Sequence, residues 1–227
     1  MDILRRFFYR MRIGKIFLII SAVLALGSCR SASSSKATYK VGTKDSLMEN
    51  QEIAILAGGC FWCIEAPFLL LDGVDTVVSG YIGGQVENPT YAQVCTGNTG
   101  HAEAVKIIYN KDKISYDELL EVFFQIHDPT QLNRQGNDIG TQYRSAIFPT
   151  NQEQAEKAQY YIKALNESAA YPSKLVTTVE VDDIFYTAED YHQNYYNNNP
   201  NEMYCQLVAR PKVEKVKKVF ADKLKKN

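Results

Sequence analysis

The residues best suited to chemistry stand in the segment Gly58-Gly59-Cys60-Phe61-Trp62-Cys63. The two glycines let the backbone turn tightly between a strand and a helix, which places Cys60 at or near a helix N-terminus. Free N–H groups and the helix dipole at that end favour a thiolate, the reactive form of cysteine. Phe61 and Trp62, the chain's only tryptophan, adjoin this cysteine. The segment predicts a nucleophilic cysteine beside aromatic rings suited to an apolar group, such as a methyl on sulfur.

Three further clusters can supply the partners of such a nucleophile. Glu103 opens a strand that is otherwise apolar, and half-burial there would raise its pKa toward that of a proton donor. Tyr143 follows the polar stretch 134–142 and can present a hydrogen-bond donor. His192 and Tyr195 lie three residues apart, so in a helix they would share one face. Taken singly, these residues fit solvated or packed side chains equally well.

A second cysteine could react with the first one. Cys205 lies in a stretch that lacks a regular pattern, and a mobile cysteine there could reach Cys60. Cys63 could also form the bridge, because the side chains of a Cys-x-x-Cys pair in a helical turn share a face. Cys95 is expected to be a packing residue. The cysteines at 60, 63, 95 and 205 could instead form two structural disulfides, although a domain of this size does not need them.

The pattern along the chain predicts the elements that position these residues. Strands are expected over 52–57, 74–81, 103–109, 142–148 and 175–181, with loops at 83–100, 133–140 and 197–205. Helices are expected over 60–71, 115–127, 150–167, 188–197 and 213–224, the second and third opened by capping boxes at Ser115 and Thr150. Pro67 conflicts with a straight first helix, so this helix should kink there or become regular only near Ile64. The order predicts an α+β fold, a two-layer split-βαβ (ferredoxin-like) sheet with helices packed on it and an irregular C-terminal segment.

Length and composition limit the class of protein. The chain has 227 residues, of which 45% are hydrophobic and 22% charged. These values are globular and exclude wholesale disorder, collagen-like chains and coiled coils. A formal net charge of -1 argues against a large nucleic-acid surface.

The first 28 residues have the pattern of a secretory signal peptide. Basic residues up to Lys15 precede a mainly apolar run at 16–26 and the small residues Gly27 and Ser28. The run is too short for a membrane-spanning helix, which needs about 20 residues. Leu26-Gly27-Ser28-Cys29 resembles the bacterial lipobox, in which the cysteine becomes the lipidated N-terminus. The alternative is an ordinary signal peptide with Cys29 near its cleavage site.

The chain is therefore expected to have four parts. These are a signal peptide at 1–28, a lipidated Cys29 with a flexible linker at 29–50, a catalytic domain at 51–206 and a Lys-rich C-terminal helix at 207–227. The expected location is the bacterial cell envelope, where the lipid anchor would hold the protein on a membrane.

Together the motifs resemble a known family, the A-type peptide methionine sulfoxide reductases, over about residues 52–206. The matching motifs follow one another in order along the chain. They are Gly-Cys-Phe-Trp at 59–62, Gly-Tyr-Ile-Gly-Gly at 80–84, Asn-Pro-Thr-Tyr at 88–91, Gly-His-Ala-Glu-Ala-Val at 100–105, His-Asp-Pro-Thr at 127–130, Gly-Asn-Asp-Ile-Gly-Thr-Gln-Tyr-Arg-Ser at 136–145 and Ala-Glu-Asp-Tyr-His-Gln at 188–193.

The resemblance implies a role for each matching residue. Cys60 would attack the sulfur of a methionine-S-sulfoxide, while Glu103 would act as the acid that protonates the sulfoxide oxygen. The hydroxyls of Tyr91 and Tyr143 would donate hydrogen bonds to that oxygen, and Asp138 would orient the site through water. Phe61 and Trp62 would hold the methyl group of the substrate. His192 and Tyr195 would line the edge of the site. Cys205 matches the family's C-terminal resolving cysteine, whereas many members have Gly or Ser where this chain has Cys63. We favour Cys205 as the resolving residue because its irregular segment can swing inward.

The same resemblance implies a recycling partner. The resulting disulfide would be reduced by a thioredoxin-like protein, and no metal or organic cofactor is needed. We expect a monomer that acts on oxidised proteins and on free methionine sulfoxide.

Two other classes of function compete with this one: a general Cys-x-x-Cys thiol–disulfide oxidoreductase, and a non-enzymatic binding lipoprotein. A zinc site is weaker than either, since no second ligand pair has zinc-like spacing.

Overall fold

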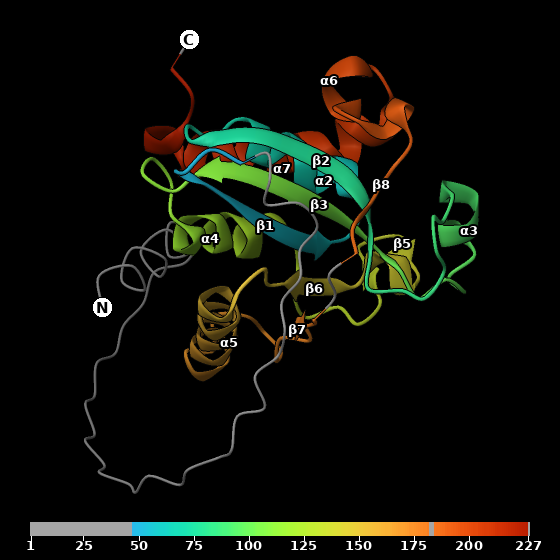
Figure 1. The fold of residues 1–227 in the computed structure, drawn as a ribbon, viewed down its shortest axis with the longest axis horizontal. Helices are drawn as coiled ribbons and strands as arrows, with labels where there is room; N and C mark the ends of the chain where they lie inside the picture. The colour runs from blue at the N-terminus through green and yellow to red at the C-terminus, as the bar shows by residue number, and fades with distance from the viewer. Residues whose placement is uncertain (1–46, 182–183, 227) are drawn as a thin grey trace, which may run out of the picture. The chain divides into compact units, whose positions relative to one another are not determined.

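One six-stranded sheet organises the part of the chain that the computed structural model describes, residues 47–181 and 184–226. The expected signal peptide, the lipidation site Cys29 and most of the linker lie outside these residues. The sheet has the order β7-β6-β1-β3-β2-β8 (Figure 1). Its strands are β1 (Gln51–Gly58), β2 (Val74–Ile82), β3 (Ala102–Asn110), β6 (Ser145–Phe148), β7 (Thr178–Val179) and β8 (Tyr186–Thr187).

The four inner strands have the split-βαβ arrangement. Strands β1 and β2 both pair antiparallel with β3, which lies between them, and β6 pairs antiparallel with the other edge of β1. The helices are α2 (Phe61–Leu69), α3 (Tyr91–Cys95), α4 (Tyr116–Ile126), α5 (Gln152–Glu167), α6 (Tyr195–Asn198) and α7 (Arg210–Val219), and a small hairpin joins β4 (Arg134–Gln135) to β5 (Asp138–Ile139). The expected α+β class and split-βαβ sheet are confirmed.

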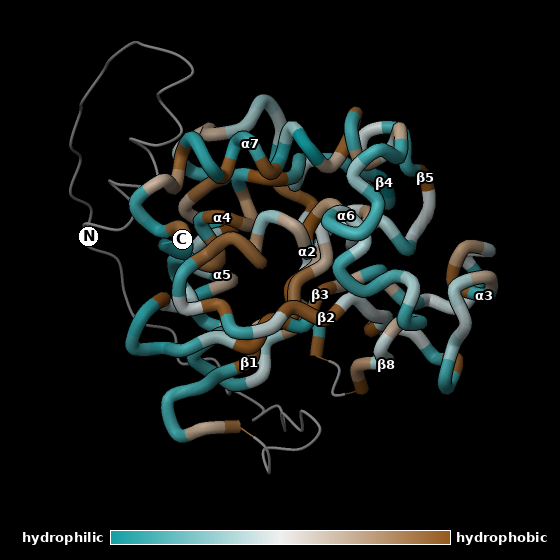
Figure 2. The backbone as a smooth tube through the Cα atoms, turned by 90° about the horizontal axis from the view of Figure 1, so that it is seen from above, coloured by the Kyte–Doolittle hydropathy of each residue, from teal (hydrophilic) through white to brown (hydrophobic). Residues whose placement is uncertain are grey.

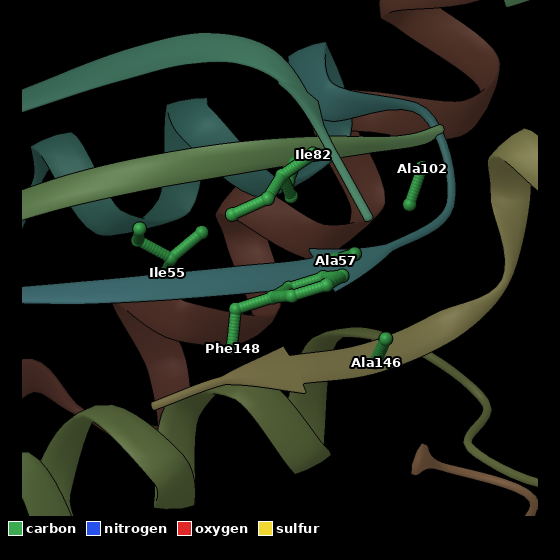
Figure 3. Packing of buried hydrophobic residues seen from close by; sticks show 7 residues of the cluster. Ile55, Ala57, Ile82, Ala102, Ala146 and Phe148 are labelled. Atoms are coloured by element: carbon green, nitrogen blue, oxygen red, sulfur yellow. The ribbon is translucent and has the colours of Figure 1, made fainter. Parts of the chain in front are cut away.

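Alternation along the strands gives the sheet two buried faces. Ile55 and Ala57 of β1, Ile82 of β2 and Phe148 of β6 belong to an apolar cluster that Figure 3 shows on one face. The neighbouring positions, Leu56 among them, point to the other face. Because Glu103 is opposite Tyr81 and two residues before Val105 in β3, all three belong to this second face, which α2 covers.

Helix α2 is continuous, so its regular part does not wait until Ile64, which was one of the two alternatives considered for Pro67. It begins at Phe61 and contains Pro67 in its interior. The proline removes one main-chain donor, whose acceptor would be the carbonyl of Cys63. Seven of the nine helical residues are buried, so tertiary packing holds the helix despite that missing bond.

Other boundaries differ from the expected ones because local side chains compete for the backbone. Residues 91–95 of the expected loop form α3, since Thr90 and Gln93 make a capping box. Helix α5 is capped by Asn151 rather than Thr150, whose hydroxyl bonds to the carbonyl of Ile53 instead. The strand expected at 142–148 begins only at Ser145, after a 3-10 turn at Thr141–Tyr143.

The strand expected at 175–181 is reduced to the two residues of β7. The N–H of Leu175 bonds to the side chain of Asn166, and the N–H of Val176 bonds to the carbonyl of Pro129. These bonds hold the start of the segment on neighbouring structure and away from the ladder with β6.

The C-terminal segment is more ordered than predicted. A π-helical turn, Cys205–Ala209, follows helical residues 203–204 and runs directly into α7, and residues 199–202 separate this continuous helix from α6. Figure 2 shows hydrophobic and hydrophilic stretches alternating along α7. The buried residues of this segment are Cys205, Ala209, Val213, Val216 and Phe220. These spacings of three and four residues form a helical stripe. The helix predicted over 213–224 therefore begins earlier, and Cys205, expected in an irregular stretch, lies in its first turns. Among the described residues, none of the helices has the length and apolarity needed to cross a bilayer.

Candidate active site

The turn that presents Cys60 is fixed from both sides. Gly59 adopts φ +100°, a conformation that favours glycine, and a Cβ on it would lie 2.7 Å from the side chain of Gln135. The Gln135 amide bonds in turn to the N–H and the carbonyl of Asp128. Cys60 then takes the N-cap position of α2 and is 7% exposed. The predicted strand–turn–helix placement of this cysteine is therefore what the structure shows.

A row of polar groups leads away from the cysteine pair. The Cys63 thiol lies beside Cys60, and its Sγ donates to the Tyr204 hydroxyl oxygen at 3.8 Å. The Tyr204 hydroxyl donates to Oδ2 of Asp138 at 2.5 Å. Asp138, expected to act through water, is therefore joined directly to the residue that precedes Cys205. The cysteine pair and Asp138, which are far apart in the sequence, form one hydrogen-bonded group.

Burial makes Cys60 a neutral thiol in the absence of substrate. Removal of the thiol from water raises its pKa well above the ordinary value, and the neighbouring Cys63 and Glu103 raise it further, while the Tyr204 hydroxyl acts in the opposite direction. The sequence led us to expect that the helix N-terminus would favour the thiolate. That effect of the helix N-terminus acts against the desolvation of the thiol.

Glu103 is buried more deeply than the sequence indicated. Its side chain is 1% exposed, and its Oε2 accepts the main-chain N–H of Phe61 at 3.1 Å. Burial raises the pKa of this carboxyl to about 8, against the opposing effect of the Phe61 N–H. Glu103 is thus mostly protonated at pH 7 and can donate a proton.

Two tyrosine hydroxyls belong to the same cluster. Tyr91 begins α3, and Tyr143 ends the 3-10 turn before β6. Burial raises the pKa of both hydroxyls, and the charge of Glu103 acts in the same direction on each. Both groups therefore remain protonated and can donate hydrogen bonds beside the Glu103 carboxyl.

Aromatic rings form the apolar side of the site. The Tyr195 ring stacks on Trp62 with centroids 3.7 Å apart and planes 8° apart. The His192 ring lies 5.0 Å from Phe61 and 4.4 Å from Tyr91, between centroids. His192 is 1% exposed and neither ring nitrogen has a hydrogen-bond partner in the structure. These residues are brought together as predicted, and they leave two buried polar atoms free for another group.

His192 and Tyr195 both lie beside Trp62, but not for the reason predicted, which was a shared helix face. The two residues do not share a helix face, because His192 ends a 3-10 turn and Tyr195 begins α6. Asn194 stands between them in the left-handed conformation, at φ +52°. This turn sends the two rings to different parts of the Trp62 surface.

The sequence analysis assigned no role to several residues that hold the site together. Glu189 accepts the Tyr81 hydroxyl and the N–H of Tyr91, each at 2.9 Å, and so ties β2 to α3. Tyr204 contacts both thiols, and its place beside Cys205 was the only signal for it. Glu65, one helical turn after Trp62, is 1% exposed. An ionisable residue inside an otherwise apolar helix was a signal that the sequence offered.

The remaining cysteines differ from expectation. Cys205 is fully buried in the π-helical turn, so the mobility expected for it is wrong for this state. Cys95, expected to be a packing residue, is exposed and contacts the Tyr91 hydroxyl. All four cysteines of the described residues are free thiols, which contradicts the reading with two structural disulfides.

A family model described as peptide methionine sulfoxide reductase matches residues 52–224. The chain belongs to the peptide methionine sulfoxide reductase family. The match extends past Gln206, where the sequence motifs fade, and includes all of the Lys-rich helix α7. The expected enzyme class, a peptide-methionine (S)-S-oxide reductase, is confirmed.

Individual relatives agree with the family match. The peptide methionine sulfoxide reductase MsrA of Deinococcus radiodurans is 50% identical over 199 residues, 88% of this chain and 96% of the relative. MsrA of Haloquadratum walsbyi is 56% identical over 173 residues, 76% of this chain and 98% of the relative. Among solved structures, the reduced form of Mxr1 from Saccharomyces cerevisiae has a TM-score of 0.67 at 32% identity, covering 74% of this chain and 96% of that chain. Methionine sulfoxide reductase A of Corynebacterium diphtheriae has a TM-score of 0.61 at 36% identity, covering 68% and 78%.

The raised pKa of Glu103 predicts how stability depends on pH. The folded pKa of about 8 exceeds the ordinary value of 4.5, so folding takes up a proton between these limits. Stability from this group is complete below pH 4.5 and decreases by about 1.4 kcal/mol per pH unit until pH passes 8. We expect Glu103→Gln to remove this decrease, measured by urea denaturation at pH 5 and pH 9. Exposed Glu87 supplies the control, since Glu87→Gln should leave the decrease unchanged. Equal pH dependence in wild type and Glu103→Gln would show that Glu103 ionises normally.

Proposed function

We propose that this protein reduces methionine-S-sulfoxide, free and in proteins, through a sulfenic acid on Cys60 and then a disulfide, and so repairs oxidised proteins. One observation carries the assignment of residues. The carboxyl of Glu103 accepts the N–H of Phe61, the residue after Cys60. A buried, protonated acid therefore lies against the backbone that carries the nucleophile. Nucleophile and acid are the two groups that this reaction requires.

In the first step the Cys60 sulfur attacks the sulfoxide sulfur. The sulfoxide oxygen is a poor leaving group until it is protonated. Glu103 provides that proton, while the hydroxyls of Tyr91 and Tyr143 donate hydrogen bonds to the oxygen. The oxygen is transferred to Cys60, which becomes a sulfenic acid, and methionine is released. The thiol loses its proton as it attacks, so Glu103 recovers a proton from within the site.

The rings place the substrate for this step. Phe61 and Trp62 hold the methyl group on sulfur, and His192 and Tyr195 form the edge of the pocket. Burial lowers the pKa of His192, so its ring is neutral at pH 7. Asp138 acts through Tyr204, whose hydroxyl it fixes beside the two thiols.

In the second step a neighbouring thiol condenses with the sulfenic acid, forming a disulfide and releasing water. We assign this role to Cys63, since its thiol adjoins Cys60 in the first turn of α2. In the reduced protein the neighbouring Cys60 thiol lowers the pKa of Cys63. Cys205, favoured from the sequence, is the alternative, and it would have to leave a buried helical turn. A thioredoxin-like dithiol then reduces the disulfide by exchange and becomes a disulfide itself.

Activity measurements with single variants test these roles. Wild-type protein with dithiothreitol should reduce only the S epimer of a blocked methionine sulfoxide, and Cys60→Ser should be inactive. Glu103→Gln should reduce the rate about 10²- to 10⁴-fold, because general acid catalysis is lost. The wild-type rate should fall as pH rises through about 8, since Glu103 then loses its proton.

Cys95→Ser is the control, because it removes an exposed thiol outside the proposed chemistry. Reduction of insulin disulfides without turnover of either epimer would instead favour the general thiol–disulfide oxidoreductase.

The resolving cysteine can be identified by trapping the sulfenic acid. After one turnover without reductant, dimedone should label Cys60 in Cys63→Ser, because its condensation partner is missing. Cys205→Ser should remain unlabelled and contain a Cys60–Cys63 disulfide in its peptide map. The reverse pattern of labelling would assign the role to Cys205. Cys95→Ser should behave like the wild type.

We further propose that the protein is exported to the bacterial cell envelope as a monomeric lipoprotein anchored through Cys29. The support is the basic, apolar and small-residue pattern that ends at Cys29, followed by a Ser-rich stretch. Expression of the full chain in a bacterium with labelled palmitate should give a labelled protein in the membrane fraction. Cys29→Ser should carry no label. A wild-type chain that is cleaved but unlabelled would indicate an ordinary signal peptide.

A further inference from the structure

The wall of the pocket formed by Tyr195 has little structure of its own. It belongs to α6, which has only four residues, and the N-cap residue Asn194 makes no side-chain capping bond. Helices this short are not stable on their own. Nevertheless the Tyr195 ring is stacked closely on Trp62. Some other group must hold the start of α6 in place.

Glu65 makes such a contact. Its Oε1 accepts the N–H of Asn194 at 2.9 Å, while its buried Oε2 has no hydrogen-bond partner among the described residues. The Asn194 N–H stands at the start of α6, where a carboxylate is favoured by both hydrogen bonding and the helix dipole. Glu65 therefore supplies from α2 the cap that Asn194 does not provide.

The position of Glu65 along α2 relates this cap to the pocket. Glu65 follows Trp62 by three residues, so the two side chains lie on the same part of the helix surface. One end of the Tyr195 segment is bonded to Glu65 while the ring of Tyr195 contacts Trp62. Helix α2 thus holds both the ring and the residue that orients the ring stacked on it.

The Glu65 carboxyl is buried at this contact. Its side chain is 1% exposed, so a carboxyl at this place without its main-chain donor would be strongly destabilising. Burial raises its pKa to about 7, against the opposing hydrogen bond from Asn194. A packing role alone would be served better by an apolar side chain, whereas the carboxyl oxygen here meets the left-handed turn at Asn194.

We propose that Glu65 is a positioning residue for substrate binding, which sets the Tyr195 ring against Trp62 by capping α6 from the neighbouring helix. The proposal rests on the proposed function in one respect, that these rings bind the methyl sulfoxide group. Its structural part is independent of catalysis. Trp62 is the only tryptophan, so its fluorescence reports on the stack without substrate.

The test compares Glu65→Leu with Tyr195→Leu, which removes the ring outright. Glu65→Leu should increase quenching of Trp62 by acrylamide nearly as much as Tyr195→Leu. It should also raise KM about two- to tenfold, the worth of one aromatic pair, with little change in kcat. Glu65→Gln keeps an oxygen for the Asn194 N–H and should lie between the wild type and Glu65→Leu.

A second capping carboxylate provides the matched control. Glu118 completes the capping box of α4, so Glu118→Gln removes a cap of the same kind without touching Trp62. It should lower stability yet leave quenching and KM at wild-type values. If Glu65→Leu does not fold, Glu65→Gln and Glu65→Asp decide the matter by the same readouts.

Wild-type quenching and KM in folded Glu65 variants would overturn the proposal. If the wild type reduced neither sulfoxide epimer, the proposed function would fail, while the quenching comparison would still decide whether Glu65 holds the stack.

Discussion

The hydrogen bond from the Phe61 N–H to the Glu103 carboxyl is the interaction on which the site depends. It joins the first turn of α2 to the start of β3, where both residues are buried. A carboxyl in such surroundings keeps its proton at neutral pH. The same bond holds the Glu103 carboxyl at the N–H of Phe61, next to Cys60. One contact therefore accompanies both the burial of the carboxyl and its position beside the thiol.

The same exclusion of water has an opposite consequence for Cys60. An acid is useful when it is protonated, whereas a thiol is useful when it is deprotonated, and burial favours the neutral form of both. The Tyr204 hydroxyl acts against this effect by lowering the pKa of Cys60, and its own proton is donated to Asp138, which holds it beside the thiols. The free enzyme accordingly stores both groups as neutral partners. Charge has to develop only when the polar S–O bond of a substrate lies between them.

Helix α2 concentrates most of this chemistry in six residues. It carries the proposed nucleophile Cys60 at its N-cap, the neighbouring Cys63, Trp62 as the ring proposed to hold the methyl group, and Glu65, which bonds the start of α6. The split-βαβ sheet makes this possible, since β3 lies between β1 and β2 and so presents Glu103 beneath the start of α2. The loops after β2 and β8 then need only to close the site from the side. Glu189 performs that task by joining Tyr81 to the start of α3.

The sequence allowed the fold class to be predicted, because the inner strands follow local patterns, and the family motifs pointed to residues that the structure brings together. Alternation gave the inner strands, and the Gly-Gly turn before Cys60 gave the position of the nucleophile. What it did not give depended on contacts between distant segments. The depth of Glu103 results from the packing of α2 over β3, and the order around Cys205 results from burial of its helical stripe under α2 and α4.

Cys205 shows how such an error affects mechanism. An irregular segment would make this residue a mobile partner for Cys60, whereas a buried π-helical turn makes its movement depend on unpacking a helix. The Tyr204 hydroxyl is bonded to Asp138 and Cys63, and Tyr204 immediately precedes Cys205. Movement of Cys205 toward Cys60 would therefore also move the residue that contacts the thiols. Cys63 already adjoins Cys60 in the first turn of α2, so the proposed disulfide with Cys63 requires no unpacking of the π-helical turn.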